Sequence, residues 1–201
     1  ISGYYITADG IALKSMLPAD VFEKTRNLKS RQPAAGSHGI ESLQHSSFNL
    51  RPLSASTSEL SEITSPVKES ISKKTYKTFL LHAPTTGHEI RCLMDSIEGV
   101  RNVIVLVPET AHIEKTAPAL IGQFGGRIAL LHGKLTKAQK RNAFNRIISG
   151  ESDIVIGTRI AVFAPLDSVS MISVFQEHNR SYKNLEGLRY NARDVAVMRG
   201  Y

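Results

Sequence analysis

Polar and charged side chains follow several short apolar runs in the second half of the chain. One run ends in Gly157-Thr158-Arg159, and another leads through Phe175 and Gln176 into Glu177-His178. A glycine, a hydroxyl and a guanidinium together suit a phosphate oxygen of a nucleotide or of a nucleic-acid backbone. A plain turn with a surface arginine explains the triplet equally well, and an isolated Glu-His pair is more often a surface feature than a catalytic one.

The segment that follows mixes aromatic and basic residues. Between residues 179 and 193 it carries Arg180, Tyr182, Lys183, Arg189, Tyr190 and Arg193. Aromatic rings stack on bases and cations contact phosphates, so this composition predicts a loop that binds single-stranded nucleic acid. A basic surface loop whose tyrosines pack against the protein is the alternative, and the sequence leaves both open.

The loop at residues 83–90 reads APTTGHEI and precedes a helical pattern. A loop that cradles nucleotide phosphates needs several glycines, whose N–H groups point inward, and a lysine that reaches the phosphates. Only Gly87 is present, and Glu89 stands where that lysine is needed. A carboxylate repels phosphate, so by itself this segment is an ordinary connection between a strand and a helix.

These loops must be positioned by alternating strands and helices. Apolar runs at residues 78–82, 103–107, 128–132, 153–157 and 171–175 predict strands that are buried on both faces. Helical patterns lie between them, after Thr86, within 110–124 and over 136–149, where Thr136 and Gln139 form a capping-box pair and Gly150 suits the end. Pro118 is expected in the first turn of its helix or at a kink. The alternation predicts a parallel α/β sheet, whose ligands bind beyond the carboxyl ends of the strands.

Composition narrows the functional class. The 201 residues are 41% hydrophobic and 21% charged, which indicates a globular protein, and the net charge of +7 is typical of domains that meet nucleic acid or anionic surfaces. No apolar run approaches the roughly 18 to 20 residues that cross a bilayer, so no membrane partner is expected. Cys92 is the single cysteine and reads as a core residue, which favours a reducing compartment, and the scattered histidines predict no metal site.

The chain divides into three stretches. Residues 1–28 contain an amphipathic pattern, and residues 29–75 read as a linker, because ten of the 22 residues from 54 to 75 are Ser or Thr, with one weak helix over 58–72. Residues 76–201 carry the regular α/β pattern. The chain starts at Ile1 and stops after an apolar helical pattern, so we expect a piece of a longer protein.

Four blocks in this order, VLVPET, RIALLHGKL, SDIVIGTRIAVFAPL and QEHNRSYKNLEGLRYNARDVAVMRG, resemble the PriA, or primosomal protein N′, family of replication-restart DNA helicases. The resemblance covers residues 76–201 well. The segment YYITADGIALKSMLP is similar to the end of that family's N-terminal DNA-binding region, whereas 29–75 match poorly where the family carries a winged-helix module. The resemblance implies a RecA-like first helicase lobe of superfamily 2, which uses ATP and Mg²⁺ to unwind DNA at abandoned forks.

The resemblance also implies site positions. The family's P-loop falls on 83–90, which includes Gly87; its glycines correspond to Ala83, Thr86 and His88, its lysine to Glu89 and its threonine to Ile90. The Walker B acidic pair falls on Phe175 and Gln176, while Glu177 and His178 are retained. The family's DNA-facing positions correspond to residues that this chain keeps, namely Gly157, Thr158, Arg159, Tyr182, Lys183, Arg189, Tyr190 and Arg193.

These departures predict a degenerate relative that binds DNA but does not hydrolyse ATP, because positioning and charge stabilisation are lost together. Two alternatives remain open: an ATP-dependent 3′–5′ DNA helicase with a divergent P-loop, and a fragment with no stable function. The implied partners are forked or single-stranded DNA and primosome or single-strand-binding proteins, in the cytoplasm at the bacterial nucleoid. The family's zinc cysteines fall outside this stretch.

Overall fold

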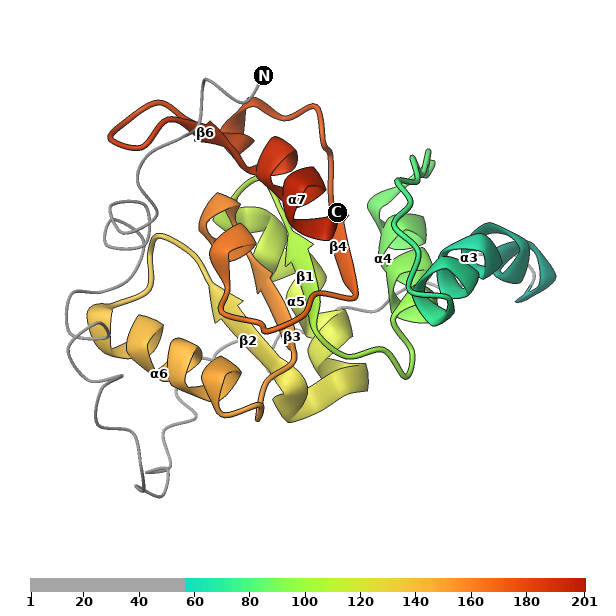
Figure 1. Cartoon of the computed structure of the whole chain (residues 1–201), viewed down its shortest axis with the longest axis horizontal. Helices are drawn as coiled ribbons and strands as arrows, with labels where there is room; N and C mark the ends of the chain where they lie inside the picture. The colour runs from blue at the N-terminus through green and yellow to red at the C-terminus, as the bar shows by residue number, and fades with distance from the viewer. Residues whose placement is uncertain (1–56) are drawn as a thin grey trace.

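Four short parallel strands form the central sheet of the protein (Figure 1). The computed structural model describes residues 57–201, so the expectations for residues 1–28 and for the first part of the linker lie outside it. The strands are β1 (Val103–Leu106), β2 (Ile128–Leu131), β3 (Ile154–Gly157) and β4 (Met171–Val174), in the spatial order β2-β3-β1-β4. Val103 pairs with Ile154 on one side and with Met171 on the other. The predicted parallel α/β architecture is therefore confirmed.

Helices cover both faces of this sheet. The longer ones are α3 (Thr57–Ser72), α4 (Thr86–Ser96), α5 (Thr110–Phe124), α6 (Lys137–Ile148) and α7 (Ala192–Gly200). Successive side chains of a strand point to opposite faces. Accordingly, Val103 and Val105 of β1 join the apolar core under α4 and α5, whereas Ile104 and Leu106 join the core under α6 and α7. The loops at the strand ends therefore stand on a sheet that is packed on both sides.

Local sequence signals set the helix ends. The capping box of α6 is present: the Gln139 N–H donates to Thr136 Oγ1 at 3.2 Å, and the Thr136 N–H donates to Gln139 Oε1 at 2.9 Å. Gly150 follows the helix with a φ of 74°, a left-handed conformation that glycine adopts without strain. Pro118 lies inside α5, well beyond its first turn, so of the two predicted positions the first-turn one is wrong.

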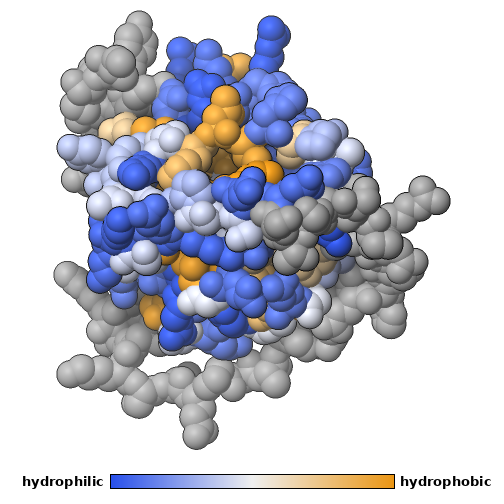
Figure 2. Space-filling view, turned by 90° about the vertical axis from the view of Figure 1, so that its right-hand side faces the viewer, coloured by the Kyte–Doolittle hydropathy of each residue, from blue (hydrophilic) through white to orange (hydrophobic). Residues whose placement is uncertain are grey.

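The predicted strand at residues 78–82 is absent from the structure. This segment precedes α4 without pairing to any described strand, and it leaves Phe79, Leu80 and Leu81 exposed by 44%, 85% and 41%. Figure 2, which views the molecule from the side of α3 and α4, shows apolar surface in a hollow among hydrophilic side chains. A strand depends on hydrogen bonds to a neighbour as well as on its residue types, and within residues 57–201 no neighbour is supplied.

The weak helix predicted inside the linker is confirmed as α3. Two of its side chains bind one carboxylate of α4: Thr64 Oγ1 donates to Asp95 Oδ2 at 2.5 Å, and Lys68 Nζ lies 2.7 Å from the same atom. Burial alone would raise the pKa of Asp95, but these contacts outweigh it and the pKa is lowered. The last part of the stretch that reads as a linker therefore packs on the α/β unit.

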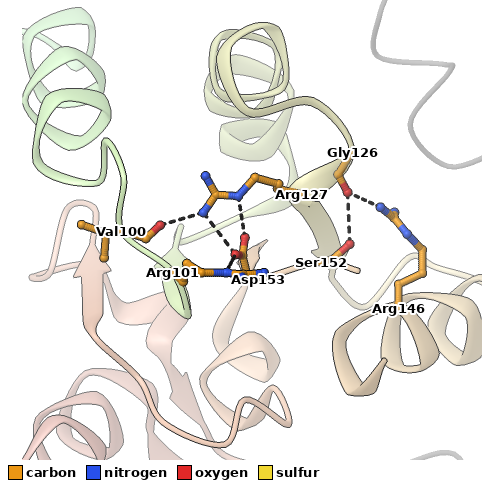
Figure 3. Close-up of polar contacts among 7 residues, drawn as sticks. All are labelled: Val100, Arg101, Gly126, Arg127, Arg146, Ser152 and Asp153. Carbon is orange, nitrogen blue, oxygen red and sulfur yellow. Dashed lines mark hydrogen bonds and ion pairs between the residues drawn. The ribbon is translucent and has the colours of Figure 1, made fainter. Parts of the chain in front are cut away.

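The amino ends of three neighbouring strands are joined by one buried carboxylate (Figure 3). Asp153, directly before β3, is 3% exposed; it accepts a hydrogen bond from Arg101 Nε at 2.7 Å and from Arg127 Nε and Nη2 at 2.9 and 3.1 Å. Arg127 Nη2 also donates to the Val100 carbonyl at 2.7 Å. Arg101 lies just before β1 and Arg127 just before β2, so these pairs link the chain entering three strands.

Pairing with two arginines keeps the carboxyl group of Asp153 ionised. Burial alone would raise the pKa of Asp153, but the hydrogen bonds and charges of Arg127 and Arg101 outweigh it and hold the pKa below the ordinary 3.8. The ionised form therefore adds stability above the ordinary carboxyl pKa. That contribution is lost as the pH falls below 3.8 through the lowered pKa.

We expect Asp153→Asn to lower the free energy of unfolding by about 1.5–3 kcal/mol at pH 7, because it removes the charge from several hydrogen bonds of a buried group. Urea unfolding at pH 7 and at pH 3 measures this, and the difference from wild type shrinks at the lower pH. Glu151→Gln is the matched control, because Glu151 forms an exposed pair with Arg146 and its loss costs less than about 1 kcal/mol. Equal effects of the two substitutions would contradict the assignment.

Candidate nucleic-acid interface

A buried tyrosine holds the loop after β4 against the carboxyl edge of the sheet. Tyr182 is 1% exposed, and its hydroxyl donates to the carbonyls of Leu106 and Phe175, at 3.1 and 2.6 Å. These carbonyls stand at or just beyond the ends of β1 and β4. Burial, with the nearby charge of Glu89, raises the pKa of Tyr182, so the hydroxyl remains a donor across the ordinary pH range. Tyr182 thus fixes where residues 175–191 lie.

The second tyrosine of this loop is also inside. Tyr190 is 8% exposed, and its ring packs edge-on against Phe163 with centroids 5.1 Å apart. Burial raises the pKa of Tyr190, partly offset by the charge of Arg159. In this structure the rings of Tyr182 and Tyr190 are buried and are not exposed for stacking on a base. This agrees with the alternative interpretation of the sequence, in which the tyrosines pack against the protein. Contact of these two residues with DNA remains a prediction.

The basic residues of the same loop point outward. Residues 183–191, here called the basic ribbon, contain the antiparallel strands β5 (Lys183–Asn184) and β6 (Tyr190–Asn191). Lys183 pairs with Asn191 across the ribbon, on the face opposite the buried Tyr190, and Arg189 is exposed as well. Within residues 57–201, neither Lys183 nor Arg189 forms an ion pair. Both cations are therefore presented to solvent.

Hydrogen bonds from a side chain close the turn of the ribbon. Asn184 Nδ2 donates to the carbonyls of Glu186 and Leu188, at 2.7 and 2.6 Å. Gly187 lies between them with a φ of 57°, which favours glycine. The turn fixes the spacing of the two cationic positions that flank it.

Three further contacts join the loops at this edge. Ser181 Oγ donates to Glu109 Oε1 at 3.2 Å, Arg159 Nη1 donates to the Ser181 carbonyl at 3.4 Å, and Arg193 Nη1 lies 3.2 Å from Glu177 Oε2. Sequence reasoning did not single out Glu109 or Ser181. The one signal for Glu109 was its position just after the strand in VLVPET, and no signal pointed to Ser181. The edge thus combines residues from the loops after β1, β3 and β4 and from the first turn of α7.

The glycine of the GTR triplet has a packing role. A Cβ on Gly157 would lie 1.9 Å from the Leu131 carbonyl oxygen and 2.7 Å from the Ala161 Cβ. The Thr158 N–H donates to that same carbonyl at 3.1 Å, which continues the β2–β3 pairing past the strand end. Only glycine allows this close approach, so Gly157 and Thr158 position Arg159 at the edge.

The segment at residues 83–90 places a carboxylate where the resemblance implies a lysine. Thr85 caps α4 and accepts from the His88 N–H at 3.4 Å, so Thr86, Gly87 and His88 form the first turn, after Ala83. Glu89 is half-buried; burial raises its pKa, partly offset by a hydrogen bond from the Gln176 backbone. Ile90 is fully buried in the apolar core.

The residues after β4 do not form an acidic pair. Phe175 is 3% exposed and belongs to the core that includes Ile90 and Ile113. Gln176 has a φ of 48°, where the chain turns away from the strand, and His178 is exposed. Within residues 57–201 no three His, Cys, Asp or Glu side chains gather as metal ligands do. In the same part of the chain, no helix has the length and apolar character needed to cross a bilayer.

Known relatives share one description. The chain is 35% identical to the "Replication restart protein PriA" of Bacillus subtilis over 138 residues, 67% of this chain and 17% of that protein. It is 29% identical to the protein of the same name from Rickettsia felis over 200 residues, all of this chain and 28% of that protein. The Haemophilus influenzae protein is 34% identical over 127 residues, 61% of this chain and 17% of its own length. No protein-family model matches the chain.

We expect Gly157→Ala to destabilise the protein by about 1–3 kcal/mol, because the added methyl group meets a backbone carbonyl that cannot rotate away. Thermal unfolding measures the change. Gly133→Ala is the control, since a Cβ there meets nothing within 4 Å. An unchanged melting temperature for Gly157→Ala would show that β2 and β3 do not approach so closely.

Proposed function

Since the chain is a homologue of the replication restart protein PriA, we propose that it is a replication-restart protein that binds single-stranded or forked DNA through the basic ribbon. The chain spans 17% to 28% of the length of the three relatives described above, so their whole activity is not assigned to it. The partners proposed with it are DNA and primosome or single-strand-binding proteins, at the nucleoid in the bacterial cytoplasm.

One observation carries the DNA-binding proposal: the cations of the ribbon are exposed, while the tyrosines in and next to the ribbon are buried. Lys183 and Arg189 lie on the outer face, and Tyr182 and Tyr190 fix the ribbon from below. Exposed cations at fixed spacing suit contact with successive phosphates and carry no base specificity. The expected interaction is therefore with the DNA backbone and depends strongly on salt.

The residues at 83–90 and after β4 do not fit ATP with Mg²⁺. The proposal is therefore that the protein does not hydrolyse ATP at this site. Glu89 adds negative charge where triphosphate oxygens need a cation, and its position beside the Gln176 backbone takes up an N–H group. The buried Phe175 offers no oxygen to a metal ion. Phosphoryl transfer depends almost entirely on positioning and charge neutralisation, and both are opposed here.

We expect the double variant Lys183→Ala/Arg189→Ala to weaken binding of a single-stranded oligonucleotide and to flatten its salt dependence. Loss of two phosphate contacts lowers the slope of log K against log salt by about 1.4, since each contact on a single strand contributes about 0.7. Fluorescence anisotropy at several salt concentrations measures this, with a fork-shaped duplex as a second probe.

A control for overall charge is Lys77→Ala/Lys115→Ala, which removes two exposed lysines that lie outside the ribbon. It should change the slope much less than the ribbon variant does. Identical slopes for the two double variants would contradict the assignment of the ribbon, and no binding by the wild-type protein at low salt would contradict the DNA-binding proposal.

We expect Glu89→Lys to show no ATPase activity. The lysine would supply the missing positive charge, but Phe175 would still offer no oxygen to bind Mg²⁺. Phosphate release in the presence of Mg²⁺ and single-stranded DNA measures it, with the wild-type protein as the baseline. Turnover by Glu89→Lys would show that the acidic residues of the nucleotide site lie elsewhere in the chain. Turnover by the wild-type protein would favour a helicase with a divergent P-loop.

A further inference from the structure

We propose that Glu177 is an internal competitor for nucleic-acid phosphate: it occupies Arg193, and single-stranded DNA must displace it to gain this cation. The inference rests on the proposed DNA binding and concerns how that same site is regulated. It follows from an ion pair at the base of the ribbon and from the charges that surround it.

Arg193 belongs to the same surface as the ribbon cations. Asn191, which pairs with Lys183 across the ribbon, accepts a hydrogen bond from the Arg193 N–H at 3.1 Å through its side chain. Arg193 therefore lies in the first turn of α7, close to the position of Lys183. Its side chain is 46% exposed, so a phosphate can reach it from solvent.

The guanidinium of Arg193 is already engaged by acids. Nη1 lies 3.2 Å from Glu177 Oε2, and Nε lies 3.3 Å from Asp194 Oδ1. Glu177 comes from the loop after β4, sixteen residues away in sequence, and Asp194 is the adjacent residue of α7. Among the cations of this edge, Arg193 is held by a carboxylate of another loop, whereas Lys183 and Arg189 form no ion pair within the described residues.

An exposed pair of this kind is weak enough to be exchanged. Exposed ion pairs contribute little net stability, so the Arg193–Glu177 contact does not need to be preserved for folding. DNA phosphates offer the guanidinium two oxygens and release counterions as they bind. The cost of displacing Glu177 reduces the affinity that the ribbon would otherwise have.

The test is the affinity of Glu177→Gln for a single-stranded oligonucleotide as a function of salt. We expect binding about two- to fivefold tighter than wild type at low salt. The salt slope should stay close to that of wild type, because DNA gains the same Arg193 contact in both proteins. Glu186→Gln is the matched control: it makes the same chemical change at an exposed position in the turn of the same ribbon, without an ion pair to Arg193.

A double-mutant cycle isolates the mechanism. If Glu177 acts through Arg193, Glu177→Gln has no more effect than Glu186→Gln in an Arg193→Ala background. If Glu177→Gln and Glu186→Gln raise the affinity equally in the wild-type background, the inference is overturned and the proposed DNA binding stays intact. The same holds if the full gain from Glu177→Gln persists in the Arg193→Ala background. Absence of binding by both the wild type and Glu177→Gln would overturn the two together.

Discussion

The arrangement of the sheet depends on the ion pairs of Asp153. Burying a carboxylate that is only 3% exposed is unfavourable unless it is paired. Here Arg101, before β1, and Arg127, before β2, offset this penalty for Asp153. The backbone repeats the same connections: the Val103 N–H donates to the Asp153 carbonyl at 2.9 Å, and the Asp153 N–H donates to the Arg127 carbonyl at 3.0 Å. Three strands therefore enter the sheet in one fixed register.

The two edges of the sheet use charge in opposite ways. At the amino edge, opposite charges are paired inside the protein, which fixes the scaffold. At the carboxyl edge, the cations of the basic ribbon face solvent, while Tyr182 and the close contact at Gly157 hold the loops from beneath. A rigid scaffold at one edge lets a polar loop at the other keep its geometry without a core of its own. This division is what makes the ribbon a candidate interface.

Where the chain departs from a nucleotide-binding loop, its substitutions agree with one another. In the proposed correspondence with a nucleotide-binding loop, Glu89 stands in place of a lysine and the buried Phe175 stands in place of an acidic side chain. The two residues come from different elements. Each change alone would disfavour ATP with Mg²⁺, and the structure places both around the turn at Gln176. The proposal that ATP is not hydrolysed at this site rests on these two positions together.

The sequence by itself determined the four paired strands and those helices that carry local signals. A capping box or an apolar period acts within one turn or one strand, so it can be recognised without knowing what packs beside it. It also identified the cations of the ribbon. Only the tertiary structure decided that residues 78–82 pair with no strand within residues 57–201, that Tyr182 and Tyr190 are buried, and that Asp153 joins Arg101 and Arg127. Each of these depends on which distant segment lies beside a residue. Pairing partners and burial are set by packing across the whole sheet, which residue types and spacing along the chain do not specify.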